Sequence, residues 1–270
     1  CIRDRYKIVP TKSPKKVAII GGGIGGMECA LVLKKRGHKP VLFEKTNELG
    51  GLFLTASAMS FKENDKELIE WYKKEVAKQG IDIRFNTEVT DLGTMRGFDE
   101  IIVATGSVPR TMPMIPGFEK TMSFTELLKE KKEVGDKVLF FGGGQSSCEA
   151  AYDLILQGKH PIIVEYAGDL VAAQATCLAN TSFLRDAMEY HKVPTYLHST
   201  ITEIHDGGVT VKGQDGKTFE VACDNVINGI GFVPAPVGDK GRHVHRVGDC
   251  VAIGNLRTVI WRAWDVCMKI

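Results

Sequence analysis

Short apolar runs alternate along the chain with longer segments in which apolar residues recur at helical spacing. Two of these runs, residues 17–20 and 138–141, are continuous hydrophobic stretches that end in three glycines. Short apolar runs bounded by glycine are typical of strands buried in a parallel sheet, and alternating strands and helices build such a sheet. The pattern therefore predicts an α/β fold.

The first of these runs leads into a Gly-x-Gly-x-x-Gly turn at Gly21, Gly23 and Gly26. Gly21 permits a tight turn, Gly23 lets a pyrophosphate approach the backbone, and Gly26 lets the following helix pack close to its strand. The N-terminus of that helix then directs free N–H groups and the positive end of its dipole at the phosphates. Because glycine-rich turns are common, the motif is weak by itself and depends on its context.

The context is a repeat. Residues 137–147 follow the pattern of residues 16–26 at an offset of 121 positions (137 − 16 = 121), without a gap. The same offset pairs Glu44 with Glu165, and each of them stands 23 residues after the first glycine of its turn. A carboxylate there can accept both ribose hydroxyls of an adenosine. Two such sets in one register predict two nucleotide-binding units; the competing interpretation is two strand–helix units that bind nothing.

Periodicity and glycine positions predict the other elements. We expect strands at 40–44, 81–85, 99–106 and 225–231, helices at 25–36, 65–79, 147–157, 181–192 and 256–269, and a hairpin over 209–221 that turns at Asp215–Gly216. Residues 1–14, which are polar and basic with two prolines, are expected to form a linker or an arm. The proline-rich stretch 108–118 is expected to cross between two domains.

Composition excludes several classes of protein. The 270 residues carry a formal net charge of +2 with acids and bases interspersed, so we expect no binding to nucleic acid or membranes. The sequence contains no run of about 18 or more apolar residues, so no membrane span is expected. No signal peptide opens the chain, and Cys29, Cys148 and Cys267 are expected to be buried thiols of a cytoplasmic protein. A chain that starts at Cys1 indicates a fragment or a processed piece of something longer.

Several of these motifs together resemble the pyridine nucleotide-disulfide oxidoreductase superfamily of flavoproteins with two dinucleotide-binding domains. The resemblance rests on Gly21-x-Gly23-x-x-Gly26, Glu44, Ala104-Thr105-Gly106, Gly142-x-Gly144 and Gly248-Asp249. More narrowly, Leu49-Gly50-Gly51, Ile115-Pro116-Gly117 and Gly254-Asn255-Leu256-Arg257 look like the C-terminal half of NADH:flavin oxidoreductases, which are similar to 2,4-dienoyl-CoA and 2-enoate reductases. In that family a TIM barrel with FMN and an iron–sulfur cluster precedes this half.

The resemblance implies two Rossmann-like three-layer domains, the second inserted in the first. Residues 15–112 and 233–270 would bind FAD, and residues 113–232 would bind NADH. The implied FAD contacts are Gly21, Gly23, Ile24, Gly25, Gly26, Glu44, Lys45, Gly50, Gly51, Leu52, Val89, Ala104, Thr105, Gly106, Gly248, Asp249, Thr258 and Val259. The implied NADH contacts are Gly142, Gly144, Gln145, Ser146, Glu165 and Gly231. No catalytic side chain and no metal ligand are implied, since the cofactors carry the chemistry.

The implied function is an FAD module that takes hydride from NADH. It relays electrons to a partner domain, an N-terminal TIM barrel with FMN and an iron–sulfur cluster, which reduces an unsaturated organic substrate. The alternatives are a stand-alone NADH-dependent reductase and a scaffold that holds ADP or FAD without turnover. The absence of Cys-x-x-Cys excludes dithiol chemistry.

Three further features of the sequence bear on this function. Ser147 replaces the third glycine of the second turn, which departs from the family pattern. The stretch 166–169 carries no cation to receive a 2′-phosphate, which favours NADH over NADPH. Cys1 is either the last ligand of a truncated cluster or a terminal residue without a chemical role; a lone thiolate without ligand spacing favours the second interpretation.

Overall fold

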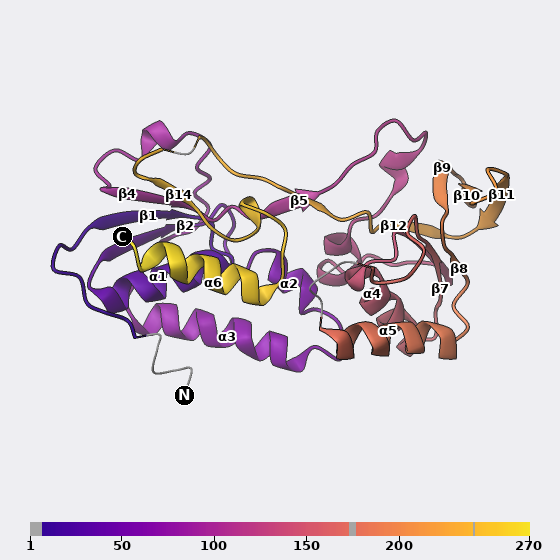
Figure 1. Ribbon diagram of the computed structural model, residues 1–270, viewed down its shortest axis with the longest axis horizontal. Helices are drawn as coiled ribbons and strands as arrows, with labels where there is room; N and C mark the ends of the chain where they lie inside the picture. Colours follow the sequence, from indigo (N-terminus) through magenta and orange to yellow (C-terminus); the bar gives the residue numbers. More distant parts are fainter. Residues whose placement is uncertain (1–6, 173–176, 240) are drawn as a thin grey trace. The chain divides into compact units, whose positions relative to one another are not determined.

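The computed structural model describes residues 7–172, 177–239 and 241–270, and it divides the chain into two units (Figure 1). The first unit takes in the described residues up to Leu54, then Glu63–Val108 and Phe232–Ile270; the second takes in Thr55–Lys62 and Pro109–Gly231. The predicted boundaries put all of 15–112 in the first domain and 113–232 in the second, so the two divisions differ over residues 55–62, 109–112 and 232. Cys1 lies outside the described residues.

The first unit is a five-stranded parallel sheet in the order β14-β4-β1-β2-β3. Its strands are β1 (Lys16–Ile20), β2 (Lys39–Phe43), β3 (Asp82–Arg84), β4 (Glu100–Val103) and β14 (Val244–Arg246). Its helices are α1 (Ile24–Arg36), α2 (Leu52–Ala56), α3 (Glu63–Lys78) and α6 (Leu256–Cys267), with short 3₁₀ turns η2 (Leu92–Thr94) and η5 (Gly248–Cys250). Alternate residues of β1 face two apolar layers: Val17 and Ile19 pack with α1, α3 and α6, whereas Ala18 and Ile20 pack with Val89, Leu92 and Phe98.

The second unit repeats this arrangement with a four-stranded parallel sheet in the order β12-β6-β7-β8. Its strands are β6 (Lys137–Phe141), β7 (His160–Val164), β8 (Thr195–Tyr196) and β12 (Asn225–Asn228), and its helices are α4 (Gln145–Leu156) and α5 (Leu178–Tyr190). A π-helical turn, η4 (Thr125–Lys129), and a 3₁₀ turn, η3 (Phe118–Lys120), precede β6. An antiparallel sheet of β9 (Thr200–His205), β10 (Gly208–Lys212) and β11 (Thr218–Ala222) covers one side. Two short strands, β5 (Ser107–Pro109) and β13 (Phe232–Pro234), pair where the chain passes between the units.

The register of the strands confirms the repeat. Lys16 pairs with Lys39 between β1 and β2, and Lys137 pairs with His160 between β6 and β7, so both partners are displaced by 121 positions. The α/β fold with a second unit inserted in the first is therefore confirmed. The predicted hairpin over 209–221 is also confirmed, as β10 and β11.

Several predicted element bounds were wrong. The strand predicted at 99–106 ends at Val103, because Gly106 takes a positive φ of 72° and the chain turns away from the sheet. The strand predicted at 225–231 likewise ends at Asn228, before Gly231 at φ 95°. Strand β9 was missed because the sequence signal of the hairpin at Asp215–Gly216 covers only two of the three antiparallel strands.

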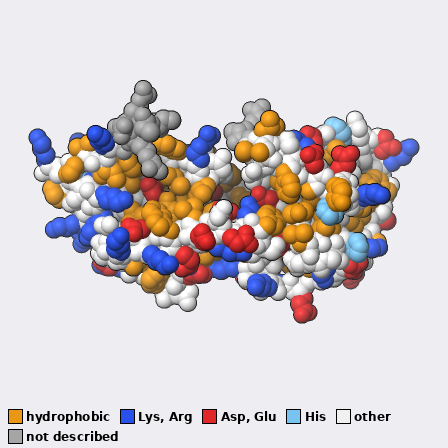
Figure 2. Space-filling model, turned by 90° about the horizontal axis from the view of Figure 1, so that it is seen from below, with side chains coloured by type: hydrophobic (Ala, Val, Ile, Leu, Met, Phe, Trp, Pro, Cys, Tyr) orange, Lys and Arg blue, Asp and Glu red, His pale blue; other side chains and the backbone are white. Residues whose placement is uncertain are grey.

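The buried cysteines and the distribution of surface charge are as expected from the sequence. Cys29, Cys148 and Cys267 are buried, as predicted, and burial raises the pKa of the Cys148 thiol to about 12. On the face drawn in Figure 2, basic and acidic side chains are interspersed. Among the described residues, no helix combines the length and the apolar character that a membrane crossing requires.

Candidate dinucleotide-binding sites

The first glycine turn joins β1 to α1 with no room for side chains at two of its glycines. Gly21 has a φ of 110°, and a Cβ there would lie 2.4 Å from the carbonyl oxygen of Ala104. A Cβ on Gly26 would lie 1.9 Å from the carbonyl oxygen of Gly21. These glycines are therefore required by close backbone contacts within the protein.

Gly23 is different, because nothing lies within 4 Å of a Cβ built on it. Gly144 in the second turn has the same open space. Both residues are helix N-caps without a side-chain capping bond, of α1 and α4 respectively. The first N–H groups of these helices thus have no capping side chain, and they face a space that a diphosphate can enter. The backbone of both turns fits the pyrophosphate of a dinucleotide.

The two predicted carboxylates occupy equivalent positions beside the turns. Glu44 accepts hydrogen bonds from Gly22 N (2.7 Å) and from Thr46 N and Thr46 Oγ1 (both 2.8 Å). Glu165 accepts from Gly143 N and from Ala167 N (2.6 Å). Gly143 and Ala167 stand 121 positions after Gly22 and Thr46, so the repeat extends to individual hydrogen bonds. Each carboxylate is held at the edge where the adenosine ribose of a dinucleotide would lie.

A second layer of backbone closes around the first turn. Gly50 N donates to Gly22 O (2.9 Å), and a Cβ on Gly51 would lie 3.2 Å from Gly23 Cα. The chain following β4 contributes Thr105, whose Oγ1 donates to Ala235 O (2.6 Å), and Gly106, whose carbonyl accepts from Ala235 N (3.0 Å). The Gly50–Gly51 and 104–106 segments thus converge on the predicted FAD-binding turn.

The returning chain brings a second helix start to the same place. A Cβ on Gly25 would lie 3.3 Å from Val259 Cγ1 and 3.9 Å from Gly248 Cα. Asn255 caps α6 with a capping box, in which its side chain accepts from Thr258 N (3.1 Å) and Thr258 Oγ1 accepts from Asn255 N (2.9 Å). The N-termini of α1 and α6 therefore begin side by side, and both direct positive dipole ends at one region.

Asp249 stands at this junction. Burial raises the pKa of Asp249 above its ordinary value, and the hydrogen bond from Gly254 N (3.1 Å) and the nearby Arg262 charge act in the opposite direction. One carboxylate oxygen is therefore engaged with the backbone of the loop that leads into α6. This placement is compatible with the predicted contact to a ribityl chain.

Other predicted contact residues have additional roles within the protein. The Val89 side chain is buried in the apolar layer with Ile20 and Val103. In the second turn, Gln145 Nε2 donates to Glu149 Oε1 (2.9 Å), and Ser146 is exposed. Lys45 and Leu52 are exposed beside the first turn.

Ser147, at the position of the usual third glycine, is 1% exposed, and its hydroxyl has no hydrogen-bond partner within the protein. At this buried position the second turn departs from the first, although its backbone and its carboxylate are equivalent.

The sequence pattern did not identify Thr46 and Ala167, which hold the two carboxylates; the offset of 121 would have paired them once one was known. It also missed Arg185 of α5, which forms an ion pair with Asp169 (2.9 Å) and donates to Leu170 O (2.9 Å). These bonds hold the loop after β7. No motif marks Arg185, because its partners are backbone carbonyls and an acid in another element.

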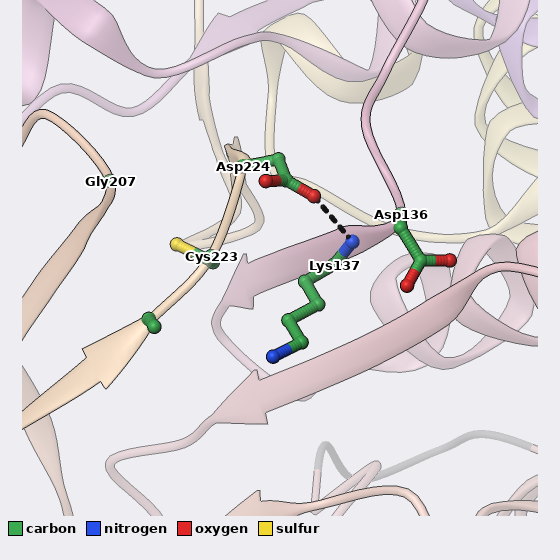
Figure 3. A pocket seen from close by; sticks show the side chains of 6 residues that line it. Asp136, Lys137, Gly207, Cys223 and Asp224 are labelled. Atoms are coloured by element: carbon green, nitrogen blue, oxygen red, sulfur yellow. Dashed lines mark hydrogen bonds between the residues drawn. The ribbon is translucent and has the colours of Figure 1, made fainter.

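The second unit also has a hollow of about 330 Å³ that none of the glycine-turn residues line (Figure 3). It is lined by Asp136, Lys137, Cys223 and Asp224, where β6 and β12 begin, and Lys137 N donates to Asp224 Oδ2 (2.8 Å). The glycine turns follow the opposite, carboxyl ends of these strands. With two carboxylates at its rim, the hollow does not suit a diphosphate. Within the described part of the chain, no group of three or more His, Cys, Asp or Glu residues could hold a metal ion.

Two parallel sheets, each with a glycine turn, an uncapped helix N-terminus and a carboxylate at the next strand end, define a protein with two dinucleotide-binding units. The family model for pyridine nucleotide-disulphide oxidoreductases matches residues 15–260, and the chain belongs to that family. The family implies binding of FAD and of a nicotinamide dinucleotide.

Comparison with individual proteins shows which members of the family this chain is similar to. The chain is 34% identical to cinnamate reductase of Clostridium sporogenes and 31% identical to NADH oxidase of Thermoanaerobacter brockii; each match covers 100% of this chain and 42% of the relative. A solved structure of a 2-naphthoyl-CoA reductase superposes with a TM-score of 0.88 at 30% identity, over 98% of this chain and 41% of that one. The predicted resemblance and the oxidoreductase class are confirmed, and the chain spans about two fifths of the length of these relatives.

Proposed function

We propose that the chain is an FAD-dependent module that takes hydride from NADH and relays electrons to a partner domain. The observation that carries this proposal is the duplicated site: two open glycine turns with two carboxylates in one register, at Gly23 and Glu44 and again at Gly144 and Glu165. Two sites of this kind suit two adenine dinucleotides, which is the arrangement that hydride transfer between a nicotinamide and a flavin needs.

FAD is assigned to the first unit because additional backbone surrounds its turn. Gly50–Gly51, the 104–106 segment, Asp249 and the start of α6 converge there. The α1 N-terminus and Gly23 would hold the pyrophosphate, Glu44 the adenosine ribose and Asp249 the ribityl chain. The α6 N-terminus would stabilise negative charge on the flavin ring. When bound, FAD supplies two-electron chemistry with nicotinamides and one-electron chemistry with other acceptors.

NADH is assigned to the second unit. The Glu165 carboxylate, which Gly143 N and Ala167 N hold in place, would accept the ribose hydroxyls and would repel a 2′-phosphate. Arg185 of α5 contacts this loop, but it is paired with Asp169 and with the carbonyls of Leu170 and Val171. Thus the loop after β7 favours NADH over NADPH.

The electron acceptor is proposed to be a domain that carries FMN and an iron–sulfur cluster, an N-terminal TIM barrel. The relatives are more than twice as long as this chain and include enzymes named for an unsaturated acid and an aromatic thioester. This supports an unsaturated organic compound as the final substrate. We further propose a cytoplasmic location, since the buried thiols suit a reducing compartment.

Two matched substitutions test the assignment. Gly23→Ala and Gly144→Ala place a methyl group in open space at φ angles of −70° and −69°, which alanine adopts, so both variants should fold. We expect Gly23→Ala to weaken FAD binding by at least about tenfold, because the methyl group excludes the pyrophosphate. Gly144→Ala should keep the yellow colour and lose anaerobic bleaching by NADH.

The alternatives give different outcomes in the same experiments. A purified chain that remains colourless with FAD and contains ADP would support the scaffold and contradict the proposal. Steady turnover of NADH with a small acceptor, by this chain alone and at a rate that an added FMN and iron–sulfur domain does not raise, would support the stand-alone reductase. Flavin loss in both alanine variants, or in neither, would contradict the assignment of the two sites.

A further inference from the structure

One short segment of the chain leaves the first unit in sequence and groups with the second. Residues 55–62, named the clip, comprise the last two residues of α2 and the stretch that leads to α3, and they group with 109–231. Thr55, Ser57 and Met59 of the clip are buried. The chain therefore passes between the units at both ends of the clip, in addition to the passages near residues 108 and 231. An element with buried side chains and two such passages is more than a surface loop.

The clip is held by a buried acid of α4. Asp153 is 6% exposed, and its Oδ1 accepts from Ser60 N (2.8 Å) and from Ser60 Oγ (2.6 Å). Its Oδ2 accepts from Gln157 Nε2 (3.0 Å). Oδ1 is thus satisfied only while the clip is docked, whereas Oδ2 is bonded to Gln157. Undocking would remove two of the three hydrogen bonds of this buried acid, which is unfavourable.

Further contacts attach the clip along the same helix. Lys62 Nζ lies 3.0 Å from Glu149 Oε1, with side chains that are 20% and 13% exposed. Phe61 packs edge-on against Tyr152 with ring centroids 5.5 Å apart. These partners, at positions 149, 152 and 153, lie on one face of α4, as a spacing of three or four residues requires.

Glu149 links the clip to the start of α4. The same oxygen, Oε1, accepts from Lys62 Nζ and from Gln145 Nε2, at 3.0 and 2.9 Å. Gln145 is the first residue of α4 and follows Gly144, the open N-cap of the second turn. A ligand phosphate that recruits the Gln145 amide would leave this oxygen to Lys62 alone and strengthen the Lys62 pair.

The other end of the clip leads to the first site. Gly50 and Gly51, which pack on Gly22 and Gly23, immediately precede α2 and then the clip. Residues 52–60 contain neither glycine nor proline and begin with a helical turn. The backbone between Gly51 and Ser60 therefore has little conformational freedom. A change in how the clip docks on α4 is therefore carried along the chain to the Gly50–Gly51 turn.

We propose that the clip couples the nicotinamide dinucleotide site of the second unit to the flavin side of the first, with Asp153 and Lys62 as positioning residues. This inference rests on the proposed function, because it requires a dinucleotide at the α4 N-terminus and a flavin beside Gly50–Gly51. Occupancy of the second turn tightens the clip, and the tightened clip fixes the Gly50–Gly51 turn for hydride transfer. By linkage, a docked clip raises the affinity for the dinucleotide by the same factor.

Hydrogen–deuterium exchange, read by mass spectrometry on peptides covering 49–62, tests the docking first. Without any ligand, Asp153→Asn and Ser60→Ala should each raise the exchange rate of residues 57–62 by about tenfold. Ser60→Thr retains the hydroxyl and should restore wild-type exchange. Asp136→Asn, at an exposed acid that pairs with His160, is the matched control and should leave this peptide unchanged. Unchanged exchange in both Asp153→Asn and Ser60→Ala would overturn the docked clip.

The coupling is tested on the FAD-loaded chain with NAD⁺, which binds without transferring hydride. NAD⁺ should slow exchange of residues 57–62 at least about threefold in the wild type and leave it unchanged in Lys62→Met. Lys78→Met, at an exposed pair on α3, is the matched control and should behave as the wild type. In stopped-flow, Lys62→Met should slow flavin reduction by NADH about tenfold, with reduction by dithionite unchanged.

The outcomes separate the two proposals. If NAD⁺ binds to the FAD-loaded wild type by calorimetry and the exchange of residues 57–62 does not change, the coupling is wrong and the proposed function stands. If the FAD-loaded wild type binds no NAD⁺, the proposed function and the coupling both fail, while the docking measured without ligand is unaffected.

Discussion

The two glycine turns share one backbone design and differ in how they fill the space behind it. In the first turn Gly26 faces a backbone oxygen so closely that a Cβ would lie 1.9 Å from it, and Ala104 is the residue that follows the neighbouring strand β4. In the second turn the corresponding residues are Ser147 and Gly229, and a Cβ on Gly229 would lie 2.3 Å from Ser147 Oγ. In the first turn the residue after the strand has a side chain (Ala104) and the helix position is glycine (Gly26). In the second turn the helix position has a side chain (Ser147) and the residue after the strand is glycine (Gly229).

This exchange explains how a motif residue can change without loss of the fold. The carboxylates keep equivalent bonds to Gly22 and Gly143, and the open N-caps Gly23 and Gly144 are retained. A side chain at Gly26 is excluded by the backbone oxygen of Gly21, whereas the Ser147 side chain occupies space that is free because Gly229 has no Cβ. A departure from the pattern at Ser147 therefore says little about ligand binding until its neighbour at 229 is considered.

Gly26→Ser should have the largest effect on this comparison. The new Cβ would meet the backbone oxygen of Gly21, which cannot move without breaking the turn. We expect a loss of stability of more than about 4 kcal/mol, or failure to fold. Denaturant unfolding of the variant checks this. A variant as stable as the wild type would show that the two turns tolerate serine equally and that Gly229 is irrelevant.

Gly229→Ala should have the next largest effect, about 2 kcal/mol, because its methyl group meets the Ser147 hydroxyl. The double variant Gly229→Ala/Ser147→Gly recreates the combination of the first turn and should recover part of this loss. Recovery would be incomplete, since the methyl group also lies 2.9 Å from Phe141 O. A double-mutant cycle by thermal unfolding measures the coupling; strictly additive losses would contradict the proposed exchange of volume.

The amino ends of the two sheets differ in acid sensitivity. Glu100 pairs with Val17 in the first sheet and Asn225 pairs with Val138 in the second, so they are equivalent positions. Burial would raise the pKa of Glu100, but hydrogen bonds from Lys15 (2.7 Å), His245 (2.9 Å) and His243 (3.4 Å) lower it to about 2. Asn225 instead accepts from Gly135 N (2.8 Å) and does not titrate.

A lowered folded-state pKa stabilises the protein above the unfolded value of 4.5 and loses that contribution as the pH falls toward 2. We expect this contribution to be on the order of 2 kcal/mol and to be absent in Glu100→Gln. Unfolding monitored between pH 5 and pH 2 should show a flatter profile for the variant. Identical pH profiles for the variant and the wild type would contradict this contribution of Glu100 to stability. Glu126 of the second unit has a similarly low pKa, about 2, through its pair with Lys132, but solvent screens that surface pair.

Substitution of the two carboxylates, Glu44 and Glu165, should give the smallest difference in stability between the two units. Glu44 serves three donors and is 7% exposed, whereas Glu165 serves two donors and is half-buried. An amide turns one of its N–H groups toward a backbone donor. We expect Glu44→Gln to lower stability by about 2 kcal/mol and Glu165→Gln by about 1 kcal/mol. Chemical denaturation of both variants measures the difference, and the reverse order would contradict it.

Much of the fold followed from local pattern. Apolar runs that end in glycine predicted the central strands β1 and β6, and the repeat predicted that β2 and β7 share a register. The ends of β4 and β12 were predicted too long, because apolar residues continue past the point where Gly106 and Gly231 turn the chain. Periodicity reports burial and not the conformation of the backbone, so such bounds are poorly determined by it.

The sequence by itself determined the two glycine turns, the two carboxylates and their common register, because each depends on residues close together in the chain and repeated at one offset. Tertiary structure decided what surrounds them. Ser147 meets Gly229, Glu100 meets His245, and Ser60 meets Asp153 only after distant segments pack together. Contacts of this kind leave no periodic signal, since they depend on where strands end and which unit a segment joins.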